Sequence, residues 1–153
     1  IMQYFNNALK ENSLPWIPRK TPITIEEIKE LWIPSLKRNL CLVAEREGRV
    51  IGSLTVFYDK DSTRYEKRNY RKPGDIGTTI DPSEDYLAVS RSLVKELLIE
   101  LKKQKKKARW TMALESPTVK AMKELGYTGR LIENVKRYKE VGLSGKVFEY
   151  SLP

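Results

Sequence analysis

The chain lacks histidine altogether and has a single cysteine, Cys41, among its 153 residues. Without histidine it cannot build a Ser-His-Asp triad or a Cys-His dyad, and one cysteine forms no internal disulfide. Zinc sites made of histidine or of several cysteines are excluded for the same reason, and no metal site is expected. Cys41 lies between two leucines, a setting typical of a buried structural cysteine. These absences remove most of the usual catalytic residues.

Long hydrophobic runs are also missing. No stretch reaches the ~20 apolar residues that a membrane-spanning helix needs, and the first residues carry no signal pattern. Hydrophobic residues make up 40% of the chain and charged residues 32%. This composition is typical of a soluble globular protein, and the length fits one domain over residues 1–153. We therefore expect a single cytoplasmic domain with no membrane partner.

Acidic residues are fewer than basic ones, 20 against 29, which gives a net charge of +9. Such a surplus favours nucleic acid, an acidic protein or a phosphorylated cofactor as partner. Five of the lysines fall in the run 102–107. A second basic stretch, residues 59–73, includes Arg64, Lys67, Arg68 and Arg71 and alternates its cations with tyrosines. Tyrosines in that pattern can stack on bases, but both stretches are also compatible with an ordinary solvated surface.

Apolar periodicity and turn residues predict an ordered series of helices and strands. Helical spacing predicts helices over residues 1–11, 24–32, 87–101 and 117–125. Thr24 and Glu27 have the spacing of a capping box, and Gly126 follows the last of these helices as a stop signal. Runs of β-branched and apolar residues predict strands over residues 40–45, 49–58, 75–80, 109–114, 131–140 and 146–152. We predict a mixed α/β fold in which strands 75–80 and 109–114 are parallel neighbours joined by the helix between them.

Three segments together resemble a known family. Residues 44–54 form an "AEREGRVIGSL" hairpin pattern, Ile80-Asp81-Pro82 precedes a helix, and residues 123–127 read "KELGY". In order and interval they resemble the GNAT superfamily of acyl-CoA-dependent N-acetyltransferases. The resemblance implies a central twisted, mostly antiparallel sheet with helices on both faces. The family's first strand has no counterpart, since the chain opens directly at the first predicted helix.

The resemblance also implies a site for acetyl-CoA. The family's pyrophosphate-binding motif falls on residues 85–90, where a helix N-terminus would offer backbone N–H groups to the phosphates. Asp85 stands where the family has a basic or polar residue, and Glu84 lies beside it. These carboxylates either repel the pyrophosphate or complement the helix dipole. The residues implied in cofactor binding are Thr78, Thr79, Ile80, Tyr86, Leu87, Ala88, Val89, Ser90 and Arg91.

Catalytic residues are harder to transfer from the resemblance. Met122 occupies the position of the family's tyrosine acid, and Glu115 occupies that of an asparagine. A thiol with a pKa near 8.5 leaves as thiolate without full protonation, so activity does not require the tyrosine. Asp75 and Glu115 are the two candidates for a catalytic general base, although the surface habit of carboxylates favours an ordinary solvated side chain at each position. Tyr138 and Tyr150 are expected to pack against the sheet.

Two functions follow as expectations. The first is acetyl transfer from acetyl-CoA to an amine on a small molecule or a protein, with no metal involved. The second is a GNAT-like fold that has lost catalysis and binds nucleic acid or an acidic protein through residues 59–73. The net charge and the departures at Asp85, Met122 and Glu115 motivate the second.

Overall fold

The computed structural model describes residues 38–58 and 73–153, together with residues 6, 7, 10, 22, 24–27, 29, 30 and 33. Its elements are α2 (Ile25–Glu27), β1 (Leu40–Arg46), β2 (Arg49–Phe57), β3 (Asp75–Ile80), α5 (Tyr86–Gln104), β4 (Ala108–Ala113), α6 (Pro117–Glu124), β5 (Arg130–Ile132), α7 (Lys136–Lys139) and β6 (Val147–Leu152). Most of the predicted first helix and of the basic stretch 59–73 lies outside the described residues. The expectation that the family's first strand is missing concerns the N-terminal part of the chain, most of which is also outside the described residues.

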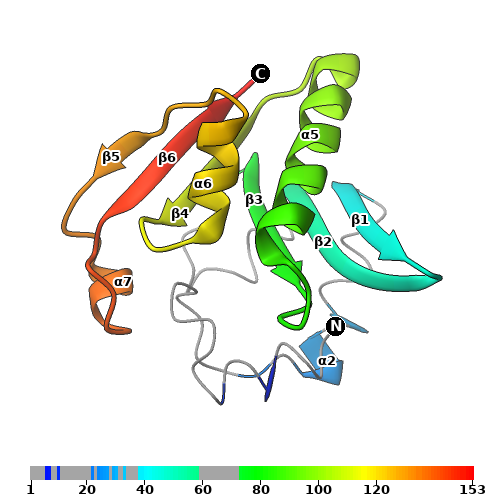
Figure 1. The fold of residues 1–153 in the computed structure, drawn as a ribbon, viewed down its shortest axis with the longest axis horizontal. Coiled ribbons are helices and arrows are strands. Elements are labelled where there is room, and N and C mark those ends of the chain that lie inside the picture. Colours follow the sequence, from blue (N-terminus) through cyan, green and yellow to red (C-terminus); the bar gives the residue numbers. More distant parts are fainter. Residues whose placement is uncertain are drawn as a thin grey trace.

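The strands form one six-stranded sheet in the order β1-β2-β3-β4-β6-β5 (Figure 1). Neighbouring strands are antiparallel, except for the parallel pair β3 and β4. α5 connects these two strands, because a parallel pair needs a crossover rather than a tight turn. The predicted parallel neighbours and the mostly antiparallel sheet are confirmed.

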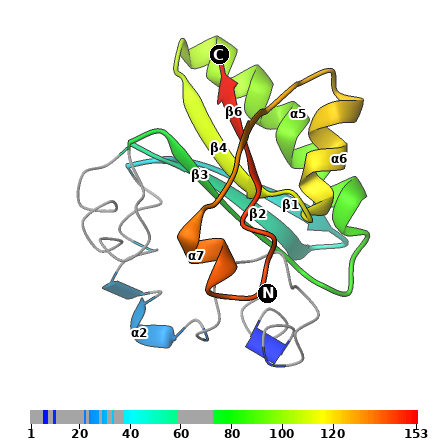
Figure 2. The ribbon, with the colours of Figure 1, turned by 90° about the vertical axis from the view of Figure 1, so that its left-hand side faces the viewer.

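Helices cover both faces of the sheet. α5 and α6 pack against each other on one face, whereas α7 lies on the opposite face (Figure 2). Leu93, Leu97 and Leu101 of α5 are almost fully buried against β-strand residues such as Leu54 and Ile80. The spacing of four residues places these leucines on one side of the helix, which explains why it seals the sheet. No helix in the described part of the chain is long and apolar enough to cross a membrane.

Local signals set the ends of the helices. The side chains of Asp85 and Ser116 cap α5 and α6 by accepting hydrogen bonds from first-turn N–H groups. At the other end of α6, Gly126 has a φ of +83°, which suits glycine. The N–H of Tyr127 donates to the carbonyl of Met122 at 2.9 Å, completing a Schellman turn. These contacts confirm the stop predicted at Gly126.

The predicted strand 131–140 is wrong over most of its length. The strand ends at Ile132, Asn134 adopts a positive φ of 60°, and the chain then forms the short helix α7. The N–H of Val135 donates to the carbonyl of Gly145, which turns the backbone away from the sheet. Tyr138 is buried, but it belongs to the helix α7 and not to the predicted strand. Cys41 also differs from expectation, since it is only half-buried on β1, which has a single strand neighbour in the described sheet.

Candidate functional site

The parallel strands β3 and β4 separate soon after they meet. Only Asp75 and Arg109 are in register, and the N–H of Arg109 donates to the carbonyl of Gly74 at 2.8 Å. From there the strands spread apart toward Ile80 and Ala113 (Figure 1). We call this gap in the ladder the β3–β4 opening. Because the two strands are parallel, α5 and α6 both start at its wide end.

The β3 residues expected to bind cofactor border this opening but differ in how available their side chains are. Ile80 is buried against α5, where Gly52 of β2 leaves room for Ile80, Val89 and Leu93. Thr79 is buried in register with Ser53 of β2. The hydroxyl oxygen of Thr78 is buried without a hydrogen-bond partner in the structure. An unsatisfied buried hydroxyl costs stability, and a bound ligand group could satisfy it.

At the start of α5, Asp85 acts as the N-cap. Its Oδ1 accepts a hydrogen bond of 3.0 Å from the N–H of Ala88. Tyr86, Leu87 and Ala88 are exposed or half-buried, whereas Val89 and Ser90 are buried. Ser90 shares a hydrogen bond of 3.1 Å with Thr118 of α6. Of the expected cofactor residues on this helix, the first three lie at its accessible end.

Arg91, the last of the expected cofactor residues, bridges the two helices of this face. One of its guanidinium nitrogens lies 2.5 Å from a carboxylate oxygen of Glu124 on α6. Its Nε is buried without a hydrogen-bond partner in the structure. Arg91 therefore ties α5 to α6.

Glu84 points away from the start of α5 and into an ion-pair cluster. Its side chain is 2% exposed and pairs with Arg46 and, at 2.6 Å, with Arg49 of the β1–β2 hairpin. Desolvation acts to raise the pKa of nearby Asp81, but hydrogen bonds from Ser83 and the charge of Arg49 outweigh it and hold that pKa below its usual range. The charge of Glu84 is therefore matched by two arginines, and Asp85 is the carboxylate at the N-cap of α5.

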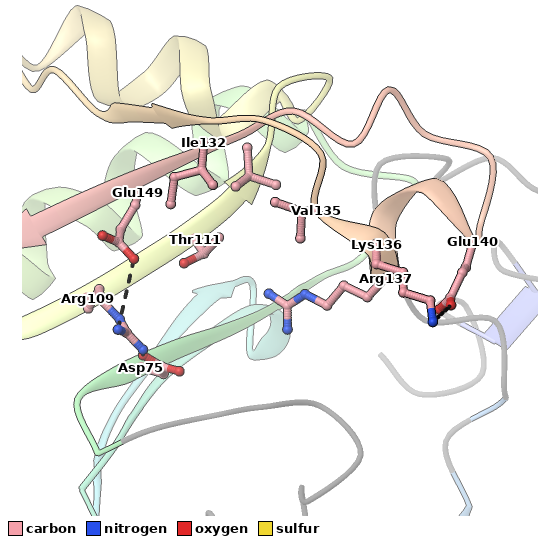
Figure 3. Close-up of a pocket in the computed structure, with 10 residues that line it drawn as sticks. Asp75, Arg109, Thr111, Ile132, Val135, Lys136, Arg137, Glu140 and Glu149 are labelled. Atoms are coloured by element: carbon pink, nitrogen blue, oxygen red, sulfur yellow. Dashed lines mark hydrogen bonds and ion pairs between the residues drawn. The ribbon is translucent and has the colours of Figure 1, made fainter.

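A cavity of about 420 Å³ lies on the sheet face that carries α7 (Figure 3). Ile132, Val135 and Val147 form an apolar wall, and Thr111 of β4 adds a hydroxyl. Asp75 belongs to the lining as well, so the cavity adjoins the narrow end of the β3–β4 opening. The two features form one continuous candidate site on β3 and β4.

The sheet side of this cavity carries a chain of ion pairs (Figure 3). Arg109 donates from Nη2 and Nε to Oδ1 of Asp75 at 2.6 and 2.9 Å. Its Nη1 lies 3.9 Å from a carboxylate oxygen of Glu149, whose other oxygen accepts from Arg130 at 2.7 Å. Four strands thus contribute one charged side chain each, which fixes the position of the Asp75 carboxylate.

The structure does not bring Glu115 to Asp75. Glu115 follows Ala113, and Ala113 is four residues beyond Arg109, about 13 Å along the strand. Its carboxylate accepts a hydrogen bond of 3.1 Å from the N–H of Ser144. Desolvation acts to raise the pKa of Glu115, but hydrogen bonds from Ser144 and from its own backbone outweigh it and lower the pKa. Glu115 is also absent from the lining of the cavity described above.

The remaining residues considered for catalysis are buried, and the packing predicted for Tyr138 and Tyr150 is confirmed. Met122 is fully buried in the core, and Tyr138 and Tyr150 are each 3% exposed. Desolvation raises the pKa of Tyr150, consistent with a packing role. Within the described residues, no three aspartates, glutamates or cysteines gather into a group that could hold a metal ion.

Sequence reasoning missed the cationic side of the site. It gave no role to Arg109 or Arg137, both of which line the cavity. A signal for Arg109 was present, because Arg109 and Thr111 alternate with the buried Trp110 and Met112 along β4. Alternation of this kind assigns the polar pair to the opposite face from the core. No comparable signal marked Arg137.

No family model matches the sequence, and no curated protein matches it either. Solved structures do match. A GNAT superfamily phosphinothricin acetyltransferase from Sinorhizobium meliloti, in complex with acetyl-CoA, superposes with a TM-score of 0.73 at 13% identity, over 99% of this chain and 80% of that one. A ribosomal-protein-alanine N-acetyltransferase from Brucella melitensis gives 0.70 at 18% identity, over 98% and 90%. An N-acetyltransferase from Staphylococcus aureus gives 0.68 at 18% identity, over 99% and 88%. The chain therefore has the fold of the GNAT N-acetyltransferases.

Proposed function

We propose that this protein is an N-acetyltransferase that moves an acetyl group from acetyl-CoA to an amine. The observation that carries the proposal is the β3–β4 opening with the accessible start of α5 at its wide end. It occurs in a fold whose solved examples include an acetyltransferase in complex with acetyl-CoA. The adjoining cavity offers separate room for an acceptor.

The residues beside the opening fit a phosphorylated, amide-bearing ligand in three respects. β3 has no strand partner on its β4 side beyond Asp75, so backbone groups there are available to pantetheine amides. The buried hydroxyl of Thr78 lacks a partner. The start of α5 combines a helix dipole with the small side chain of Ala88, which favours a pyrophosphate. Thr78, Thr79 and Ile80 would hold the pantetheine, and residues 86–91 the phosphates.

Acetyl-CoA supplies a thioester, and the protein must hold the amine and receive its proton. Asp75 is the lining carboxylate that lies at the narrow end of the β3–β4 opening, and we assign it the role of proton acceptor. Arg109 holds Asp75 through two hydrogen bonds to one oxygen. Because Met122 supplies no proton, the thiolate leaves unprotonated, as its low pKa relative to an alcohol permits. We assign Glu115 no catalytic role, because its carboxylate accepts a hydrogen bond from the N–H of Ser144 away from the cavity.

Titration with acetyl-CoA, followed by calorimetry and thermal shift, tests this function. We expect saturable binding, and we expect Asp85→Asn to tighten it by roughly 2- to 5-fold at low salt, because asparagine caps a helix as well as aspartate does but carries no charge. Glu96→Gln is the matched control, since it removes an exposed carboxylate from the same helix 11 residues away, about 16 Å along the axis. Absence of heat and of any thermal shift at millimolar acetyl-CoA would refute the proposal.

A second candidate function is binding of a polyanion, favoured by the location of the lysine run. Lys102, Lys103, Lys105, Lys106 and Lys107 are all exposed. The ammonium of Lys106 lies 4.8 Å from the ring centroid of Tyr58, whose hydroxyl donates to the carbonyl of Lys107 at 2.8 Å. Gly74 lies against that same carbonyl. The chain therefore leaves for the basic stretch 59–73, and returns from it, beside this run.

Salt dependence distinguishes this second function from simple surface charge. If it is correct, single-stranded RNA binds at ~50 mM salt, and replacing three of the lysines by glutamine lowers the slope of log K against log salt by roughly 0.7 per lost phosphate contact. A fluorescence anisotropy titration at several salt concentrations measures that slope. Replacing Lys120 and Lys123 of α6 by glutamine removes charge elsewhere and serves as the control. An unchanged slope in the first variant would eliminate the lysine run as a binding surface.

A further inference from the structure

The cavity beside the β3–β4 opening has charged side chains on two sides. On its sheet side the lining includes Asp75, Arg109 and Glu149, and Arg130 beside Glu149 completes the chain of ion pairs. On the α7 side the lining includes Arg137 together with Lys136 and Glu140, which lie 3.6 Å apart. A ligand with an amine at one end and an anionic group at the other would meet the Asp75 carboxylate on one side and the Arg137 guanidinium on the other.

Arg137 is the cationic side chain best placed to meet such an anion. Its guanidinium projects from α7 into the cavity, toward the sheet side (Figure 3). The guanidinium carbon lies 4.9 Å from the ring centroid of Tyr138, and Nη2 lies 3.4 Å from the Tyr138 hydroxyl oxygen. Tyr138 is itself buried against Ala113 and Val147. Stacking on a buried ring holds the planar donor group in place before a ligand arrives, so less entropy is lost on binding.

Size and polarity restrict the remainder of the ligand. A volume of about 420 Å³ lies within the range of roughly 300–1,000 Å³ that is usual for small-molecule sites. The apolar wall of Ile132, Val135 and Val147 suits an aliphatic group more than a second charge. The narrow end of the opening, where the amine would have to react, begins at Asp75.

We infer that the acceptor is a free amino acid with an aliphatic side chain, whose carboxylate is bound by Arg137 and whose amine points to Asp75. A guanidinium binds a carboxylate through two parallel hydrogen bonds, which fixes orientation as well as position. The side chain would lie on the apolar wall, and the amine would face the β3–β4 opening. The assignment of this ligand as acceptor rests on the proposed function, whereas its binding in the cavity does not.

Binding to the protein without acetyl-CoA is the first test. L-leucine, L-valine and L-methionine are titrated by calorimetry beside their carboxamides, which keep the amine and the side chain but lose the carboxylate. We expect at least one acid to bind at least 10-fold more tightly than its amide. Arg137→Gln removes that preference, and Arg137→Lys restores part of it, because lysine keeps the charge without the two-pronged geometry.

Lys139→Gln provides the matched control on the same helix, since Lys139 donates to Asn134 and is not part of the cavity lining. It should bind the amino acids as the unchanged protein does. Thermal melting of each variant verifies that it is folded. Equal affinity for acid and amide, or unchanged binding in Arg137→Gln, would overturn the inference.

Kinetics with acetyl-CoA separate this inference from the proposed function. We expect Arg137→Gln to raise KM for the amino acid at least 10-fold with a smaller change in kcat, because Arg137 binds a part of the acceptor that does not react. If acetyl-CoA binds but acetylation proceeds equally well on peptide N-termini in both proteins, the inference fails and the transferase survives. If the amino acid binds through Arg137 but acetyl-CoA does not bind, the cavity assignment stands and the transferase fails.

Discussion

Replacing Leu97 by alanine is expected to lower the free energy of unfolding by about 3 kcal/mol. Leu97 is fully buried in the middle of α5, where it packs against the sheet. The substitution removes three buried side-chain carbon atoms together with their contacts. It leaves a cavity that the surrounding strands can close only in part. For a domain of this length the same loss corresponds to a fall in melting temperature of roughly 6–12 °C. Chemical denaturation and thermal melting measure the two quantities.

Ile99→Ala is the matched control, since Ile99 is 58% exposed on the same helix. It changes helix propensity by a similar small amount but removes little buried surface, so its effect should stay within about 0.5 kcal/mol. Equal losses in the two variants would mean that α5 does not pack on the sheet through Leu97. The difference between them measures the contribution of the buried face.

Much of this fold could be predicted because its strongest elements depend on local pattern. Leu93, Val94, Leu97 and Leu101 are all buried on one side of α5, whereas a strand would send the adjacent Leu93 and Val94 to opposite faces. The turn at Glu47 and Gly48 requires two positive φ values, which a glycine and its neighbour supply between two apolar runs. Elements of this kind are specified by the residues within them, so the sequence alone is enough to predict them.

The error at residues 131–140 has the opposite origin. Leu131, Ile132 and Val135 have the composition of a strand, and Asn134 is the one residue among them whose type favours a turn. The turn depends on a hydrogen bond from Val135 to Gly145 and on burial of Tyr138 beside Ala113 and Val147. These are contacts between distant segments, so the pattern of the segment itself could not reveal them.

The candidate site was predictable only in part for the same reason. The sequence nominated Asp75, and the structure places it in the lining of the cavity. Its partner Arg109 lies 34 residues away, and Glu149 belongs to the last strand. The divergence of β3 from β4 is a feature of three-dimensional geometry with no counterpart in residue type. Arg137 lies on α7, a helix that the sequence pattern did not predict, so the sequence could not identify Arg137 as a site residue.

Asp75→Asn is expected to lower kcat for acetyl transfer by roughly 100-fold or more, because a positioned proton acceptor contributes about 10²–10⁴-fold. Asparagine has nearly the same shape but cannot take a proton from the amine. The measurement is a steady-state assay of CoA release with the amino acid that turns over best. Glu115→Gln is the matched control, and its carboxylate, bonded to Ser144 beyond the far end of β4, should be dispensable for turnover.

The Asp75 variant also breaks an ion pair, so a second substitution must separate chemistry from structure. Arg109→Met disrupts the same two hydrogen bonds, of 2.6 and 2.9 Å, but leaves the carboxylate in place. If Asp75 accepts the proton, Arg109→Met retains far more activity than Asp75→Asn although it loses comparable stability. If both variants lose activity in proportion to their stability, Asp75 only braces the sheet. A loss in Glu115→Gln with none in Asp75→Asn would move the proton acceptor to the other end of β4.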